Sequence, residues 1–295
     1  MPAKQRLPFL RRGDHAIPAS PSMDQTHLLT LLFRKCLAFC AVLMALAVCG
    51  VASARGDWRA DLSSPGAGNF PPLRPVTLEY ECGWSGLIAG TVTARFSRVA
   101  GDLCELKVTA ATTGFPRALW RMDATHDAMA DVAAMRPVAV RQKEMYRAQT
   151  ISTDLDFDDG GVWRLRQSTT DKSPARRKRY EFPNLYDLQT ALLYVRSQAL
   201  ETGSTYRMVV CPGNCAYLAT VTVLGREQIK VKAGSYPAIK IDLKLQKVNG
   251  EMKLEPHGKF KHATGWLSDD ADRLPLRMNA QIFVGSVWVE LQKVE

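Results

Sequence analysis

The sequence lacks the short motifs that identify most hydrolases, nucleotide-binding proteins and metalloenzymes. It contains no H-E-x-x-H, no G-x-S-x-G, no P-loop and no G-x-G-x-x-G. Histidine is scarce, and only His126, His257 and His262 follow residue 54. The last two are five positions apart, which places them on opposite faces of an extended strand. We therefore predict no catalytic residues, no metal site and no cofactor.

A strong excess of either charge is also missing. The chain has a formal net charge of +10, but six Lys/Arg and two Asp/Glu precede Arg55, which leaves 33 basic and 27 acidic residues, or +6, after it. This mild excess is too small to indicate nucleic-acid binding and is compatible with weak attraction to anionic lipid head groups. Arg176–Arg179 is a dense basic run, interpreted as a solvated loop; the alternative is a contact with anionic lipid or an acidic partner.

The N-terminal region has the pattern of an export signal. Arg34 and Lys35 precede an apolar run from Cys36 to Val51, and Ala52-Ser53-Ala54 supplies the cleavage pattern. The run is shorter than the roughly 20 residues of a membrane span. We predict a signal peptide over 1–54, with translation starting at Met1 or Met23, cleavage near Ala54, and a periplasmic or secreted product with no transmembrane span.

Cysteine is infrequent in the exported part. Of seven cysteines, Cys82, Cys104, Cys211 and Cys215 follow the leader. An even number in an oxidising compartment predicts two disulfides. Cys211 and Cys215 flank Pro-Gly-Asn, which is turn chemistry, so we expect one bond at a hairpin mouth and the other between Cys82 and Cys104. Free thiols are the alternative.

What the rest of the chain does contain is a series of short β-type runs. Residues 55–75 are rich in Gly, Pro and Ser and are predicted to be a flexible arm. Residues 76–295 are predicted to form a single β-rich domain of short strands separated by turns. One helix is expected over 185–200, capped by Asn184 and amphipathic along Leu188, Leu192 and Val195. The predicted fold is mainly β: an antiparallel β-sandwich or an open barrel, with this amphipathic helix packed against it.

Several spaced residues resemble a known family. The most distinctive stretch is Trp266-Leu267-Ser268-Asp269-Asp270-x-x-Arg273-Leu274-Pro275. Supporting positions are Leu78, Tyr80, Trp84, Gly86, Gly90, Tyr186, Asp187, Leu192, Tyr194, Arg196, Gly203, Tyr206, Gly225, Glu227, Gly234, Gly285 and Ser286. The pattern resembles the bacterial exported family called domain of unknown function 3108. The resemblance implies an exported β-rich protein and supplies no reaction.

The signature also has a physical interpretation. Asp269 and Asp270 can cap a tight turn, Arg273 can pair back to them, and Pro275 can begin the next strand. Three functions stay open at this point. The first is a non-catalytic carrier of an apolar or amphipathic envelope molecule, such as a lipid, in a concave sheet. The second is an envelope module that docks a protein partner through an edge strand or through Arg176–Arg179. The third, less favoured, is a hydrolase that uses Asp269 or Asp270.

Overall fold

A computed structural model describes residues 57–213, 215–258, 260–282 and 285–295 of the chain. The predicted signal peptide, its cleavage site near Ala54 and the alternative start at Met23 lie outside these residues. Described are a 3-10 helix, two α-helices and fifteen strands: η1 (Trp58–Asp61), β1 (Val76–Trp84), β2 (Leu87–Arg98), β3 (Leu103–Thr112), α2 (Gly114–Leu119), β4 (Met122–Asp131), β5 (Arg136–Tyr146), β6 (Thr150–Asp158), β7 (Gly161–Ser168), β8 (Arg177–Glu181), α3 (Leu188–Ser197), β9 (Thr205–Val210), β10 (Ala216–Val231), β11 (Gly234–Val248), β12 (Leu254–Pro256), β13 (Phe260–Ser268), β14 (Pro275–Ile282) and β15 (Ser286–Val294).

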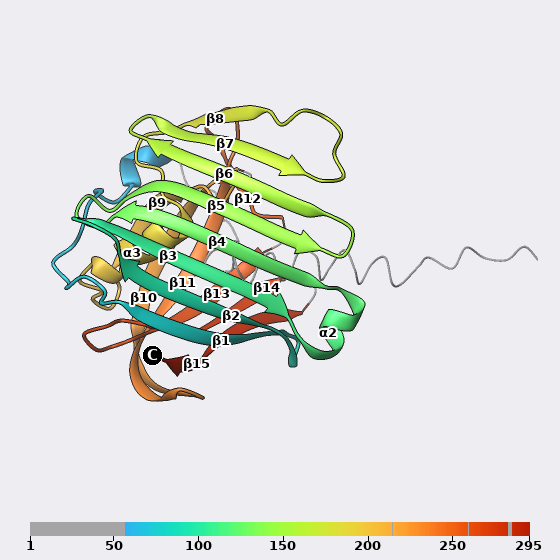
Figure 1. Cartoon of the computed structure of the whole chain (residues 1–295). Helices are drawn as coiled ribbons and strands as arrows, with labels where there is room; N and C mark the ends of the chain where they lie inside the picture. Colours follow the sequence, from blue (N-terminus) through green and yellow to red (C-terminus); the bar gives the residue numbers. More distant parts are fainter. Residues whose placement is uncertain (1–56, 214, 259, 283–284) are drawn as a thin grey trace, which may run out of the picture.

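All fifteen strands belong to one antiparallel sheet, which curls into an open barrel (Figure 1). Their order is β8-β7-β6-β5-β4-β3-β2-β1-β15-β14-β13-β11-β10-β9, with β12 attached to β11. The last strand, β15, pairs with β1 and so joins the two halves of the chain. A single continuous sheet decides between the two predicted architectures in favour of the open barrel, with β8 and β9 as its free edges.

Alternating burial explains why the sheet curls. Every second residue of β4 is buried, from Met122 to Ala130, and β1 alternates in the same way over most of its length. One face of each strand therefore leaves water, and right-handed twist then bends the sheet around that face. Between β6 and β7, Asp158 pairs with Gly161 across a two-residue Asp-Gly turn, which is typical hairpin chemistry.

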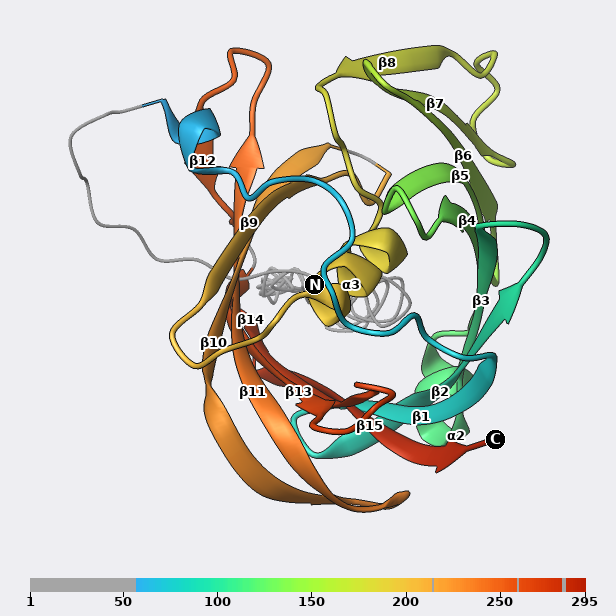
Figure 2. The ribbon, with the colours of Figure 1, turned by 90° about the vertical axis from the view of Figure 1, so that its left-hand side faces the viewer.

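Helix α3 lies inside the curl of the sheet rather than on its surface (Figure 2). Nine of its ten residues are buried, and only Leu192 is half-buried. The cap is Asp187, whose carboxylate accepts the backbone N–H groups of Gln189 and Thr190 at 3.1 and 3.0 Å. The predicted cap at Asn184 is wrong because the helix begins only at Leu188: Asp187 is extended, and Tyr186 is bridged to Val210 of β9.

The predicted flexible arm follows a defined path across α3. The Trp58 ring stacks on Phe182 at 5.8 Å, and Ser63 exchanges two hydrogen bonds with Arg207 of β9. Further along, Gly68 donates its N–H to Ser197 Oγ at 3.0 Å. We call residues 62–75 the strap, because they cross the C-terminal end of α3 before entering β1 (Figure 2).

Candidate ligand-binding site

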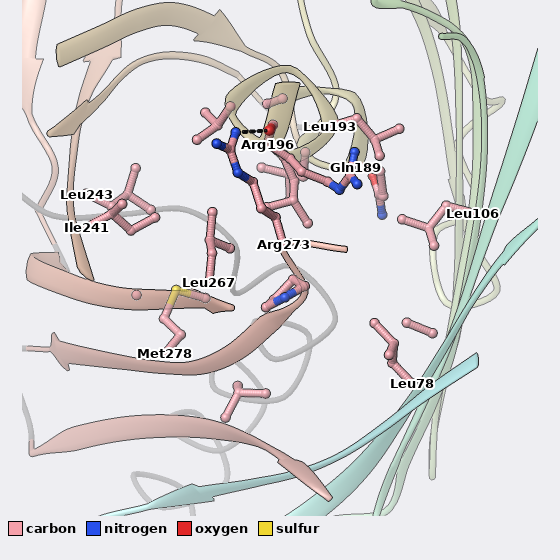
Figure 3. Close-up of a pocket in the computed structure, with 18 of the residues that line it drawn as sticks. Leu78, Leu106, Gln189, Leu193, Arg196, Ile241, Leu243, Leu267, Arg273 and Met278 are labelled. Atoms are coloured by element: carbon pink, nitrogen blue, oxygen red, sulfur yellow. Dashed lines mark hydrogen bonds between the residues drawn. The ribbon is translucent and has the colours of Figure 1, made fainter. Parts of the chain in front are cut away.

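The space between α3 and the inner face of the sheet contains a cavity of about 190 Å³. Side chains from β1, β3, β11, β13 and β14 meet those of α3 around it (Figure 3). The lining is largely aliphatic and includes Leu78, Leu106, Leu193, Leu243, Leu267 and Met278. The aromatic residues of the described lining are Tyr80, Phe96 and Trp266.

Gln189 is the polar group that distinguishes this cavity from ordinary core. Its side chain comes from the first turn of α3, and the residue is only 7% exposed. The buried side-chain oxygen Oε1 has no hydrogen-bond partner among the described residues. A buried acceptor without a donor costs about 1–3 kcal/mol. No local pattern marked Gln189, because a glutamine on a predicted helix is by default solvent-exposed.

Arg196 and Arg273 close the cavity where α3 ends. Both are more than nine-tenths buried, and both guanidinium groups lie against the ring of Phe70 from the strap, at 5.2 and 3.4 Å from its centroid. Arg196 donates to the carbonyl oxygens of Pro71, Ala271 and Asp272. Burial, and then the charge of Arg273, lowers the pKa of Arg196 to about 10, so it stays protonated at neutral pH.

Arg273 serves as the C-terminal cap of α3. It donates Nη1 to the carbonyl oxygens of Arg196, at 2.8 Å, and Gln198, and Nη2 to that of Ala199 at 3.4 Å. The last carbonyls of a helix lack partners within the helix, and a cation there also meets the negative end of its dipole. The prediction that Arg273 pairs back to Asp269 and Asp270 is therefore wrong. The family signature joins the β13–β14 turn to the helix inside the barrel.

The other signature residues build that turn. Ser268 donates Oγ–H to Asp270 Oδ1 at 2.7 Å, and the same carboxylate oxygen accepts the N–H groups of Asp272 and Arg273. Asp269 instead forms an ion pair with Arg226 at 2.8 Å. Pro275 begins β14 as expected, and its carbonyl accepts the Tyr80 hydroxyl. Each carboxylate thus has a structural partner, which leaves the hydrolase hypothesis without a pair of carboxylates held across a cleft.

From β4 onward, the inner face of the sheet carries polar side chains beside the apolar ones. The register places His126, Gln142, Thr153 and Arg166 side by side across β4 to β7. His126 is 3% exposed, its Nε2 has no hydrogen-bond partner among the described residues, and burial lowers its pKa to about 4. The imidazole is therefore neutral at pH 7. This polar row lies beside the apolar cavity, because His126 pairs with Val108, which lines it.

The four cysteines are all free thiols in the structure. Cys82 lies opposite Gly90 and Cys104 opposite Arg98, eight positions apart along β2. At about 3.3 Å per residue this is roughly 26 Å, whereas a disulfide needs Cα atoms within about 7 Å. A Cys82–Cys104 bond is therefore excluded by the register. Burial raises the pKa values of Cys104 and Cys211 to about 11, so neither is a reactive thiolate.

The basic run is a strand rather than a loop over most of its length. β8 begins at Arg177, and the guanidinium groups of Arg177 and Arg179 both lie over the Trp163 ring. Arg177 pairs with Asp156 and Arg179 with Asp158, at 3.5 and 2.6 Å. These contacts neutralise two of its four cations.

The histidines near the C-terminus also have structural partners. His262 Nδ1 lies 2.8 Å from Asp242 Oδ1, and His257 Nδ1 accepts the N–H of Phe260. Within the described ranges no three His, Cys, Asp or Glu side chains are grouped as metal ligands. A search of the same residues finds no helix of the length and apolarity needed to cross a membrane.

These features define a class of protein: an open antiparallel barrel that encloses a helix and, beside it, an apolar cavity. The sequence model described as protein of unknown function (DUF3108) matches residues 79–292. The chain belongs to this family, as its signature residues indicated.

Comparison with solved structures supports the fold. The chain is similar to a β-barrel-like protein of domain of unknown function DUF1849 from Brucella abortus, with a TM-score of 0.54 and 12% identity over 76% of this chain and 98% of that one. A Bacteroides fragilis protein assigned as exported, with a YmcC-like fold, aligns over 78% of this chain and 99% of its own, with a TM-score of 0.31 and 9% identity. A Parabacteroides distasonis protein assigned as a lipoprotein aligns over 79% of this chain and 100% of its own, with a TM-score of 0.33 and 8% identity. No functionally curated protein matches the sequence.

Proposed function

We propose that the protein binds and carries a small apolar or amphipathic molecule of the cell envelope in the cavity beside α3. The observation that carries the proposal is Gln189, a residue of the cavity lining whose buried side-chain oxygen has no donor among the described residues. An apolar cavity of about 150 Å³ is already large enough to hold benzene. The cavity of about 190 Å³ thus has room for one short chain or ring, and not for a whole phospholipid.

The ligand should carry a hydrogen-bond donor at one end. A hydroxyl or amide N–H that reaches Gln189 Oε1 would satisfy the buried acceptor, while the apolar part replaces empty space against Leu78, Leu106 and Leu243. Arg196 and Arg273 cannot accept a hydrogen bond from this donor, because a guanidinium group only donates, and here both donate to backbone carbonyls.

Two matched probes test this assignment: 1-hexanol, which has a donor, and hexane, which has none. We expect 1-hexanol to bind the parent protein about tenfold more tightly than it binds the Gln189→Leu variant. The reason is that the variant lacks the only polar contact proposed for the hydroxyl group. Hexane should bind the variant at least as well as the parent protein. Isothermal titration or ligand-induced shifts in melting temperature measure both.

A space-filling variant controls for binding elsewhere. Leu106→Trp should abolish binding of both probes, whereas Leu224→Trp, on an exposed side chain outside the lining, should change neither. Equal binding by the parent protein and Leu106→Trp would falsify the cavity as the site. Mass spectrometry of an organic extract of gently purified protein would then identify the natural ligand.

Docking of a protein partner through the basic run has less support. Arg177 and Arg179 are held by Asp156, Asp158 and Trp163, so the run is part of the sheet rather than a free basic loop. The edge of β8 is short and charged, as is usual for strands that avoid edge-to-edge pairing.

We also propose export of the protein, with cleavage before Arg55, and a local disulfide between Cys211 and Cys215. The support is the leader pattern and the turn chemistry between these cysteines. Intact mass under non-reducing conditions tests both statements. A mature chain starting at Arg55 and lighter by two hydrogens is expected, and Cys211→Ser should remove that loss.

A further inference from the structure

Large apolar side chains are exposed at one end of the barrel. Leu87 and Ile88 follow the β1–β2 turn and are 58% and 51% exposed, and Phe115 and Leu119 of α2 are 72% and 52% exposed. They are four of the seven large apolar residues most exposed in the described ranges. Turns normally consist of Gly, Pro, Asn, Asp and Ser, so bulky apolar residues at neighbouring tips need a reason.

These four residues lie on neighbouring tips of the barrel, which together we call the apolar rim. Thr113, just before α2, donates its N–H to the carbonyl of Ala89, which adjoins Ile88. On the other side, Ser85 donates its N–H to the carbonyl of Ser286, the first residue of β15, at 2.8 Å. Figure 1 shows α2 and the end of β1 at the same end of the barrel, opposite α3.

Basic side chains flank the rim. Residues 113–123 contain Arg117, Arg121 and Asp123, and this aspartate pairs with both arginines, at 2.7 and 3.4 Å. Arg147 of the β5–β6 turn is exposed and donates Nη2 to the carbonyl of Ala118 in α2 at 2.9 Å. Three guanidinium groups thus surround α2 with one carboxylate between them, which leaves a local positive charge.

We propose that the apolar rim docks the protein onto an anionic lipid bilayer. Separate convex tips can insert between lipid head groups, while flanking arginines bind the phosphates. A stable protein interface instead needs a contiguous, well-packed patch of about 800 Å² on each partner. Burial of apolar area and charge attraction together supply membrane affinity, and the rim has both. The proposal does not depend on the cavity or its ligand.

Vesicle sedimentation tests the proposal with the full chain, expressed with its own N-terminal segment. The probes are vesicles of phosphatidylcholine alone and of phosphatidylcholine with 30 mol% phosphatidylglycerol. We expect binding to the anionic vesicles that weakens as salt rises. The double variant Phe115→Ser/Leu119→Ser should bind at least tenfold more weakly, and Arg121→Gln/Arg147→Gln should bind several-fold more weakly with a flatter salt dependence.

Matched controls keep the test decisive. Val99→Ser and Leu224→Ser remove exposed apolar side chains outside the rim and should bind like the parent protein. Circular dichroism melting shows whether the rim variants are folded. The proposal is overturned if the parent protein does not bind the anionic vesicles. It is equally overturned if rim and control variants bind them with the same affinity, which is the result expected if an uncleaved leader carries the binding. It is also overturned if the rim variants abolish only self-association, measured by sedimentation velocity, which would make the rim an interface between copies.

Discussion

The two ends of the barrel differ in what they bury: one buries charged side chains, and the other exposes apolar ones. At the end entered by α3, Arg196 and Arg273 are buried, and each is satisfied by backbone carbonyls and by the Phe70 ring. At the end that carries α2, Phe115 and Leu119 are exposed, and their neighbouring arginines lie at the surface. Buried polar groups with full partners fix one arrangement of the chain, whereas exposed apolar groups gain nothing within the monomer. The first end stabilises the fold, and the second is the end that we propose to contact a lipid bilayer.

The largest effect should come from the cap of α3. Arg273→Met leaves carbonyl oxygens of Arg196, Gln198 and Ala199 without their donor, and we expect a loss of about 3 kcal/mol in the free energy of unfolding. Urea denaturation measures it. Arg226→Met breaks a half-exposed ion pair with Asp269 and one 3.3 Å hydrogen bond to the carbonyl of Leu200, and it should cost about 1 kcal/mol. Equal losses would mean that the signature arginine is not a cap.

The strap should be the next most sensitive element. A Cβ on Gly68 would lie 2.2 Å from the carbonyl oxygen of Ser197, which is backbone and cannot move aside. We expect Gly68→Ala to destabilise the protein by about 2 kcal/mol and to expose α3 to amide hydrogen exchange. Gly250→Ala, where an added Cβ meets nothing within 4 Å, is the control and should leave both measurements unchanged.

The interior between the two ends should respond to pH through His126. Its pKa of about 4 when folded lies below the 6.5 of an unfolded histidine, so the unfolded chain binds more protons between these values. Stability from this group is complete above about pH 6.5 and falls as pH drops toward 4. The loss is about 2 kcal/mol between pH 7 and pH 5.

Comparison with His126→Gln isolates this contribution. Burial raises the pKa values of Glu144 and Asp187, and these groups act in the opposite direction over the acid range. The stability difference between parent protein and variant should therefore change by about 2 kcal/mol between pH 7 and pH 5, measured by urea denaturation at each pH. His262→Gln, on a half-exposed ring, supplies the control. A constant difference would show that His126 is not buried as a neutral ring.

The smallest effect on stability should be at the apolar rim. Phe115→Ser/Leu119→Ser removes side chains that are already largely exposed to water. We therefore expect the free energy of unfolding to change by less than about 0.5 kcal/mol. Thermal denaturation measures it. A loss of several kcal/mol would place these side chains in the folding core and remove the contrast between the two ends.

Local sequence signals predicted the strands well because each is encoded by its own neighbours. Alternation indicated most of β1, and Asp159–Gly160 indicated the turn between β6 and β7. The same kind of signal failed for the strap, whose Gly, Pro and Ser indicate flexibility unless distant groups hold them. Ser197 and Arg207, more than a hundred positions away, supply those hydrogen bonds.

The sequence by itself determined the β-rich class, the family and the tight turn capped by Asp270, since these depend on contacts a few residues long. Only the tertiary structure decided that one sheet closes around α3, that Arg273 caps this helix from the β13–β14 turn, and that Gln189 faces an apolar cavity. Each of these depends on which side of a curved sheet a distant side chain reaches. Hydrophobic periodicity indicates which face of a strand or helix is buried, but it does not indicate which distant residues that face contacts.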